Sequence, residues 1–339
     1  MNLFSPLPLL RNPHVQTILG NVLPAAVRLP PSPRRLIALT DGDAIVAHET
    51  SSRECHPAKP IAILAHGLGG SHRSAYMIRM TSRLRALGWR AFRLDLRGAG
   101  LGMRFARRLY TAGCSDDIAQ AVTTVAHAFP GSPIALIGFS LGGNIVLKHT
   151  GEAGDSVHPA LISVVALAPP IDLVRCSELI AKLPFYDRWY VRHLLQQVAE
   201  HSRVRPEIPL MRFPPNLTLL QFDDIYTAPR WGYRDALEYY KDSSALPRIS
   251  TIRVPTLILT ARDDPFVSVA PFEEIGSLPQ VQIHIATHGG HLGFLGHDGA
   301  GGIRWAETRV IEWLTQRLAV HSVRGDYGGR DLPYSASGI

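Results

Sequence analysis

Short apolar runs alternate with segments of helical periodicity between Ile61 and Pro170. The runs IAILAH, WRAFRLDL, PIALIGFS and ALISVVALAPP have the length and composition of buried strands. The segments SAYMIRMTSRLRALG, SDDIAQAVTTVAHAF and LGGNIVLKHT are predicted helices. Strands that alternate with helices favour a mostly parallel central sheet with helices on both faces. The chain is therefore predicted to have an α/β fold.

The alternation is interrupted once and then resumes. Residues 171–246 are rich in aromatic and charged side chains and lack buried strands, which predicts a helical cap inserted over an active site. A second helical lobe without a lid function is the alternative. The core is predicted to span 34–170 and 247–320, beginning with a β-hairpin around Asp41-Gly42-Asp43. Residues 1–33 are predicted to form an irregular arm, and 321–339 a flexible tail.

Composition narrows the class of protein. The chain has 339 residues, of which 46% are hydrophobic, enough for a large core. Its formal charge of +7 comes mostly from scattered arginines, without the basic block typical of nucleic-acid binding. The positive charge would also allow peripheral contact with anionic lipid surfaces. Three cysteines without C-x-x-C spacing indicate a reducing compartment. Because no apolar run is long enough for a transmembrane segment and prolines interrupt the N-terminus, we expect a cytoplasmic protein.

The segment GFSLGG matches the G-x-S-x-G pattern, with Gly138, Ser140 and Gly142 at the fixed positions. It lies between a predicted strand and a predicted helix, which is the context of a nucleophile elbow. In so tight a turn, side chains two residues before and after the serine would clash, so both positions are glycine. This favours Ser140 as a nucleophile over the alternative, a purely structural turn.

The segment HGLGG at 66–70 follows the first buried strand directly. A glycine-rich loop there lets the backbone approach a substrate closely. The Leu68 and Leu141 N–H groups are therefore candidates for an oxyanion hole. A simple turn is the alternative interpretation of this segment.

Two adjacent acids, Asp263 and Asp264, follow the strand-like run PTLILTA. Pro265 restricts Asp264 to an extended conformation at the sheet edge. We favour Asp264 as the catalytic acid, with Asp263 as a solvated neighbour. Asp223 and Asp224 fall in the cap and are given no catalytic role.

Three histidines, His284, His288 and His291, lie in HIATHGGHLGF. On a helix they would share one face and could bind zinc. Gly289 and Gly290 are poor helix formers, however, and VQIHIA alternates like a strand. His284 is then predicted to be exposed, His288 to end the strand, and His291 to lie on a loop that folds back over the sheet edge. This favours His291 as the base, with His288 as runner-up and no metal site.

Ordered motifs between about residues 10 and 320 resemble the YheT-like branch of the α/β-hydrolases, which contains bacterial YheT and eukaryotic ABHD-type lipases and esterases. The motifs include NPHVQTI, HGLGGSH, RGAG, LYTAG, GFSLGGN, FDDIYTAP, DDPFV and GGHLGF. The resemblance implies the α/β-hydrolase fold, with Ser140 as nucleophile, Asp264 as acid and His291 as base. It also implies activity on short- to medium-chain acyl esters, acylglycerols or phospholipids. The segment NPHVQTI has no derived role and is interpreted as an arm packed on the core.

These features predict a serine hydrolase that cleaves a small-molecule or lipid carboxylic ester through an acyl-enzyme, without a cofactor. Transfer of the acyl group to an alcohol is the alternative, and a non-catalytic ligand-binding scaffold is a third interpretation. The aromatic residues expected to line an acyl pocket are Phe185, Trp189, Tyr190, Tyr226 and Trp231.

Overall fold

A computed structural model describes residues 3–52 and 59–327, with side chains described through residue 322. Its centre is an eight-stranded sheet in the order β1-β2-β4-β3-β5-β6-β7-β8. The strands β1 and β2 form the predicted hairpin, β2 pairs antiparallel with β4, and the other neighbours are parallel. The bounds are β1 Arg34–Ala38, β2 Ala44–Thr50, β3 Ile61–Ala65, β4 Arg90–Asp95, β5 Ile134–Phe139, β6 Leu161–Leu167, β7 Thr256–Ala261 and β8 Val281–Ala286.

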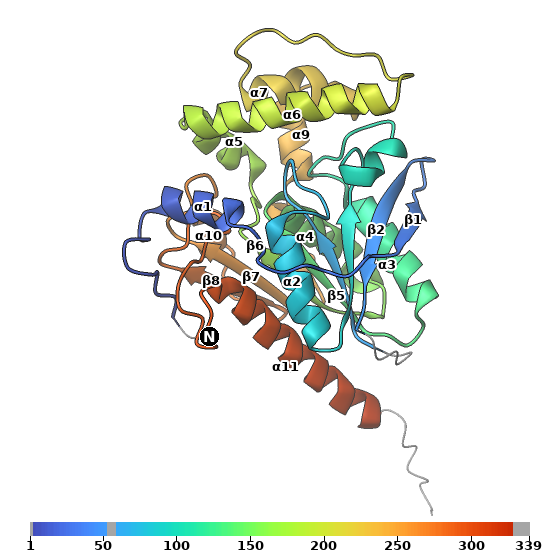
Figure 1. Ribbon diagram of the computed structural model, residues 1–339, viewed down its shortest axis with the longest axis vertical. Coiled ribbons are helices and arrows are strands. Elements are labelled where there is room, and N and C mark those ends of the chain that lie inside the picture. Colours follow the sequence, from blue (N-terminus) through green and yellow to red (C-terminus); the bar gives the residue numbers. More distant parts are fainter. Residues whose placement is uncertain (1–2, 53–58, 328–339) are drawn as a thin grey trace, which may run out of the picture.

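Helices cover both faces of this sheet (Figure 1). The central strand β3 shows why, because its side chains alternate between two buried clusters. Ile61, Ile63 and Ala65 pack with α3 and α4, whereas Ala62 and Leu64 pack with α2 and α11. The predicted α/β architecture is confirmed. The helices of the core are α2 Ala75–Ala86, α3 Ser115–Ala128, α4 Leu141–Ala153, α10 Ala270–Glu274 and α11 Trp305–Tyr327, with short 3₁₀ helices η1 Gly100–Arg104, η2 Gly154–Ser156 and η4 Leu246–Thr251.

Between β6 and β7 the chain leaves the sheet and forms a helical layer beyond the carboxyl ends of the parallel strands, at the top of Figure 1. Its described residues contain no strand. Apolar side chains of this layer, such as Leu194, Phe222 and Tyr226, form one buried cluster with residues of β6 and β7. The elements are α5 Leu173–Ala181, α6 Pro184–Val204, α7 Leu219–Phe222, the π-helical turn η3 Asp223–Thr227, α8 Ala228–Arg230 and α9 Ala236–Ser243.

Both ends of the described chain are more ordered than predicted. The arm contains a helix, α1 Pro13–Val22, because Asn12 caps it and Pro13 occupies its first turn. Helix α11 continues past His321, where a flexible tail was expected to begin. Residues 328–339 of that expected tail lie outside the described residues. Over 3–52 and 59–327, none of the helices combines the length and apolar character needed to cross a bilayer.

Candidate active site

The turn between β5 and α4 holds Ser140 in an unusual conformation. Its φ of 50° and ψ of −121° lie where side-chain-bearing residues are rarely found, and such strain concentrates at functional sites. A Cβ on Gly138 would lie 2.3 Å from the carbonyl oxygen of Gly142, and one on Gly142 would lie 2.5 Å from that of Ala65. Glycine is therefore required at both positions for the backbone to turn so tightly.

The structure brings Ser140, His291 and Asp264 together from three distant segments. The His291 Nε2 atom lies 2.7 Å from Ser140 Oγ, and its Nδ1 lies 2.8 Å from Asp264 Oδ2. The side chains of the histidine and the acid are 5% and 0% exposed. The other Asp264 oxygen accepts hydrogen bonds from the backbone N–H groups of Phe266 and Val267. The carboxylate is thus fixed by backbone amides while it orients the imidazole.

The neighbouring pair, Asp263 and His288, is separate from this chain of hydrogen bonds. Asp263 Oδ2 lies 3.3 Å from His288 Nδ1, and Asp263 Oδ1 accepts from the backbone N–H of Gly290. Their side chains are 18% and 39% exposed. This pair shapes the loop before His291 and does not contact Ser140.

The prediction that His284 is exposed is wrong. It is half-buried, and its ring lies 5.3 Å from the ring of Trp305 at the start of α11. Helix α11 covers this face of β8, a contact that the strand alternation alone did not reveal.

The loop that carries His291 is strained and is held from outside by α1. Leu292 and Phe294 have φ values of 60° and 43° although neither is glycine. The hydroxyl of Thr17 accepts a hydrogen bond from the His291 N–H at 2.9 Å. The fully buried side chain of Gln16 bonds to both the N–H and the carbonyl of Leu295. Two residues of NPHVQTI therefore fix the backbone on both sides of the loop.

Helix α1 also touches the helical insertion. At its contact with the histidine loop, a Cβ on Gly20 would lie 2.6 Å from the Cα of Gly293, so the two backbones meet without side chains between them. On its other side, His14 Nδ1 lies 3.1 Å from the hydroxyl of Tyr186 in α6. The interpretation of NPHVQTI as an arm packed on the core is confirmed.

The HGLGG loop leaves one amide free beside Ser140. Gly67 N–H donates to the hydroxyl of Tyr76, and Gly69 N–H donates to that of Tyr110. The N–H groups of Leu68 and Leu141 make no hydrogen bond to any part of the chain that the structure describes. Both residues line the cavity next to Ser140. The tyrosines thus fix the loop, and the amide of Leu68 in the loop and that of Leu141 at the start of α4 are available for a ligand oxygen.

One cluster of potential metal ligands occurs among the described residues, formed by His48, His72 and Asp95. Asp95 already accepts hydrogen bonds from both imidazoles and from the backbone N–H groups of His72 and Leu101. Burial alone raises the pKa of this carboxyl, but these donors hold it well below its usual range. Because its lone pairs are occupied, we interpret the cluster as a structural connection that joins β2 and β4 to the loop after β3.

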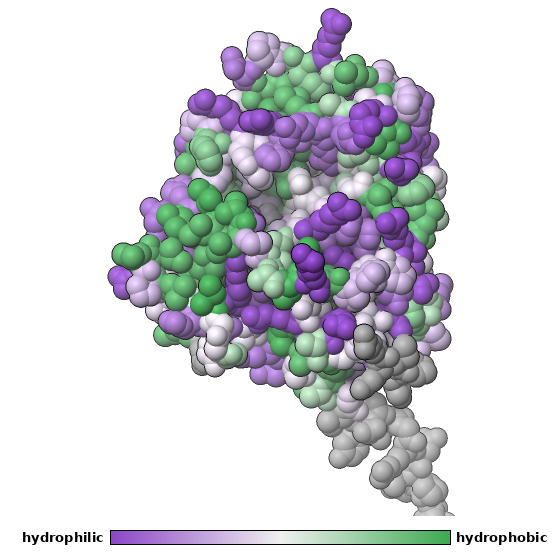
Figure 2. Space-filling model, in the orientation of Figure 1, coloured by the Kyte–Doolittle hydropathy of each residue, from purple (hydrophilic) through white to green (hydrophobic). Residues whose placement is uncertain are grey.

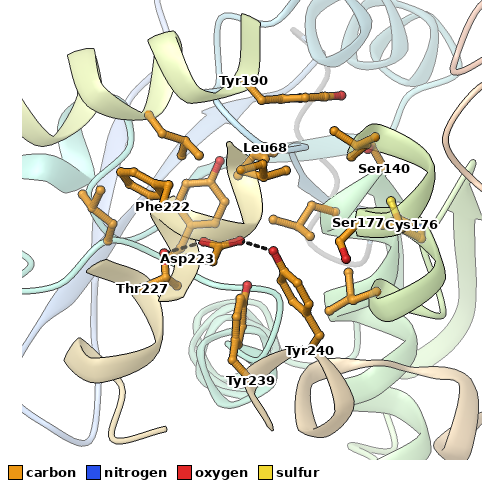
Figure 3. A pocket seen from close by; sticks show the side chains of 18 of the residues that line it. Leu68, Ser140, Cys176, Ser177, Tyr190, Phe222, Asp223, Thr227, Tyr239 and Tyr240 are labelled. Carbon is orange, nitrogen blue, oxygen red and sulfur yellow. Dashed lines mark hydrogen bonds between the residues drawn. The ribbon is translucent and has the colours of Figure 1, made fainter. Parts of the chain in front are cut away.

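Two cavities meet at Ser140 and His291. The inner chamber lies under the helical insertion and is lined by residues that include Leu68, Leu141, Leu173, Tyr190, Phe222, Asp223, Thr227, Tyr239 and Tyr240 (Figure 3). The outer groove lies between α1 and α6 and is lined by residues that include Thr17, Ile18, Val22, Phe185, Trp189, Tyr190 and Leu292. Figure 2 shows hydrophobic surface over α1, at the left of the view. Each of the five predicted aromatic residues lines at least one of these two cavities.

Sequence reasoning missed several residues that shape the site. Tyr110 and Thr17 lie in LYTAG and NPHVQTI, two motifs that carried the family resemblance without any assigned role. Asp223, in FDDIYTAP, was treated as an ordinary cap acid, yet it is buried and lines the inner chamber. The signal was the motif itself, but a motif does not say which of its side chains faces the cavity.

Comparisons with known proteins agree with this architecture. A family model described as "Serine aminopeptidase, S33" matches residues 56–294. The "Putative esterase YheT" of Escherichia coli is 31% identical, and the match covers 94% of this chain and 95% of that protein. A solved esterase, Pf2001 of Pyrococcus furiosus, superposes with a TM-score of 0.57 at 16% identity, covering 94% of this chain and 98% of that one. The chain therefore belongs to the α/β-hydrolases, and within them to the YheT-like branch.

Eukaryotic relatives are longer than this chain. The monoacylglycerol lipase of Saccharomyces cerevisiae is 29% identical over 81% of this chain, which spans 64% of that protein. The phospholipase ABHD3 of Mus musculus is 28% identical over 70% of this chain, which spans 59% of that protein.

Proposed function

We propose that this protein is a serine hydrolase of carboxylic esters, with Ser140 as nucleophile, His291 as general base and Asp264 as the acid that orients it. The observation that carries the proposal is the continuous chain of short hydrogen bonds from Asp264 through His291 to Ser140. A serine hydroxyl needs such a base to become nucleophilic at neutral pH, and the base needs a partner that fixes its tautomer.

Catalysis begins when Ser140 Oγ attacks the acyl carbonyl and its proton moves to His291 Nε2. The carbonyl oxygen becomes an oxyanion, which the free N–H groups of Leu68 and Leu141 stabilise. His291 then gives its proton to the departing alcohol, leaving the acyl group on Ser140. Water, activated by the same imidazole, attacks this ester and releases the acid.

The substrates are short- to medium-chain acyl esters or acylglycerols. The mostly apolar lining of both cavities supports this class, as do the names of the yeast and mouse relatives. In this proposal residues 171–246 act as a cap over the site. Their helices supply much of the inner chamber wall.

We also propose a cytoplasmic enzyme that touches lipid surfaces transiently. Cys114 and Cys176 are free thiols, which suits a reducing compartment. Val22 and Phe185, each 65% exposed, stand at the rim of the outer groove. An apolar rim of this kind is suited to contact with an ester-containing surface.

A fluorophosphonate probe tests the assignment of the nucleophile. The wild type should become labelled, and Ser140→Ala should lose both the label and about 10⁶ of kcat towards p-nitrophenyl esters. Equal labelling of the two proteins would refute the role of Ser140.

Acyl transfer to an alcohol is the second candidate. The outer groove opens beside His291 and is lined by apolar side chains, so an alcohol can approach the acyl-enzyme there in place of water. Product analysis with added ethanol separates the two reactions. A transferase yields mostly ethyl ester, whereas a hydrolase yields mostly free acid.

A further inference from the structure

The inner chamber has a polar group on its far wall that ester hydrolysis does not use. Asp223 is buried and lines the chamber together with Thr227 and Tyr240. The Thr227 hydroxyl donates to Asp223 Oδ1, and the Tyr240 hydroxyl donates to Oδ2, both at 2.6 Å (Figure 3). We call these three residues the acid wall.

We propose that the inner chamber binds the acyl chain of the ester and that the acid wall recognises a hydroxyl group near the free end of that chain. The inference rests on the proposed function, because it assigns a substrate class to the same site. It predicts that the preferred esters are hydroxyacyl esters, in which the hydroxyl lies at one particular distance from the carbonyl carbon.

The environment of Asp223 is unusual for a purely structural residue. Over the described residues, no arginine, lysine or histidine forms an ion pair with its carboxyl group. Burial raises its pKa to about 6, because a low-dielectric environment disfavours the charged form. A buried carboxylate without a cation is costly for folding, and an amide in its place would avoid that cost.

Asp223 retains the capacity to accept another hydrogen bond. A carboxylate can accept about four hydrogen bonds, and this one accepts two from the hydroxyl groups of Thr227 and Tyr240. The remaining lone pairs suit a donor supplied by a ligand. A ligand hydroxyl is the neutral donor that fits a chamber whose other walls are mainly apolar.

The local backbone directs Asp223 into this position. Residues Asp223–Thr227 form a π-helical turn between α7 and α8, a rare conformation that is frequent at functional sites. The turn places Thr227 over Asp223, while Tyr240 comes from α9. The neighbouring Asp224 is exposed and accepts a hydrogen bond from the N–H of Ala236, so only one of the two acids enters the chamber wall.

The positions of the two cavities assign the acyl chain to the inner chamber. The leaving alcohol must take a proton from His291, which lines both cavities, but the outer groove has an exposed rim at Val22 and Phe185 through which a product can leave. The inner chamber alone contains Leu141, whose N–H is a proposed oxyanion donor. The alcohol therefore departs through the groove, and the acyl chain occupies the chamber.

Matched substrates test the proposal directly. We would measure kcat/KM for p-nitrophenyl esters of unbranched acids of four to twelve carbons, each with a terminal hydroxyl or with a methyl group in its place. Wild type should prefer the hydroxyl ester by about 10- to 100-fold at one chain length and show a ratio near one at the others. A ratio at or below one for every length would overturn the proposal.

Variants of Asp223 then test whether this residue binds the hydroxyl group of the acyl chain. Asp223→Leu should abolish the preference, and the more conservative Asp223→Asn should reduce it about tenfold. Because the readout is a ratio of two substrates on one preparation, partial unfolding does not alter it. Asp224→Asn makes the same change one residue away and should keep the wild-type ratio. A preference unchanged in both Asp223 variants would also overturn the proposal.

The outcome separates this proposal from the proposed function. If Ser140 is not labelled and no ester is cleaved, the assignment as a serine esterase fails. If Ser140 is labelled and plain esters are cleaved with no preference for the hydroxyl, only the role of the acid wall fails.

Discussion

The core and the helical insertion each contribute one buried carboxyl group to the surroundings of Ser140, and the two groups have different partners. Asp264, in the loop after β7, accepts from one imidazole and two backbone amides. Asp223, in the helical insertion, accepts from two side-chain hydroxyls. The first arrangement fixes a carboxylate rigidly and gives it a single proton donor to orient. The second leaves a carboxyl with spare acceptor capacity in a cavity wall.

Both acids are buried aspartates, so burial and residue type do not distinguish them. The hydrogen-bond donors that surround each carboxyl group do. The amides of Phe266 and Val267 belong to the backbone of the loop after β7 and cannot rotate independently of it, whereas the hydroxyls of Thr227 and Tyr240 rotate with their side chains. Rigidity suits a group that must hold a catalytic base, and adaptability suits a group that contacts ligands.

The largest expected effect is the difference in kcat between variants of His291 and of His288. His291→Ala should lower kcat by about 10⁶, because the serine loses its base. His288→Ala removes a partly exposed imidazole that does not touch Ser140 and should change kcat by less than about threefold. Initial rates on a p-nitrophenyl ester measure both variants. A large loss in His288→Ala would mean that the wrong histidine has been assigned.

The two adjacent acids provide the next comparison. Asp264→Asn should lower kcat by about 10⁴, since an amide favours the wrong imidazole tautomer. Asp263→Asn keeps an acceptor for the Gly290 N–H and should cost less than about tenfold. Stopped assays on purified variants, normalised by fluorophosphonate titration, distinguish the two. Similar losses in both variants would contradict the assignment of Asp264.

The carboxyl group of Asp223 should make the free energy of unfolding depend on pH. Its folded-state pKa of about 6 lies above the ordinary value of 3.8, so the folded protein binds this proton more tightly. The contribution of Asp223 to the free energy of unfolding is therefore fully present at low pH and is lost as the pH rises from about 4 through 6. The shift corresponds to roughly 3 kcal/mol. Asn cannot ionise, so Asp223→Asn should gain up to this amount relative to wild type between pH 4 and pH 7.5.

Urea unfolding at several pH values measures this difference, and other titrating groups cancel between the two proteins. Asp224→Asn, one residue away and exposed, is the control and should show no such trend. A pH-independent difference for Asp223→Asn would show that its carboxyl is not destabilised by burial.

The smallest expected effect tests whether the hydrogen bond from α1 helps to position His291. Thr17→Val has nearly the same shape but leaves the buried N–H of His291 without its acceptor. We expect kcat to fall about tenfold, because a small displacement of the base misaligns it with Ser140. Thr17→Ser keeps the hydroxyl and should stay close to wild type. Equal activity of the Val and Ser variants would show that this hydrogen bond does not position His291.

Much of the fold was predictable from the sequence because local patterns carry it. The strand–helix alternation and the Gly138-x-Ser140-x-Gly142 turn depend on neighbours in the chain, and each lies where it was expected. The proximity of Asp264 and His291 followed from strand-end placement, since carboxyl ends of parallel strands meet at one edge of the sheet. The partial burial of His284 could not be predicted, because it depends on how Trp305 of the separate helix α11 packs against β8.

Contacts between segments far apart in the chain were decided only by the tertiary structure. The role of NPHVQTI emerged when Gln16 and Thr17 were seen to bond the loop around His291, some 270 residues away. The orientation of Asp223 depended on a π-helical turn and on Tyr240 from another helix. Sequence by itself determined the sheet, the elbow and the kinds of chemistry available. Packing decided which carboxyl faces which donor, because hydrogen bonding and burial are set by whatever element lies alongside.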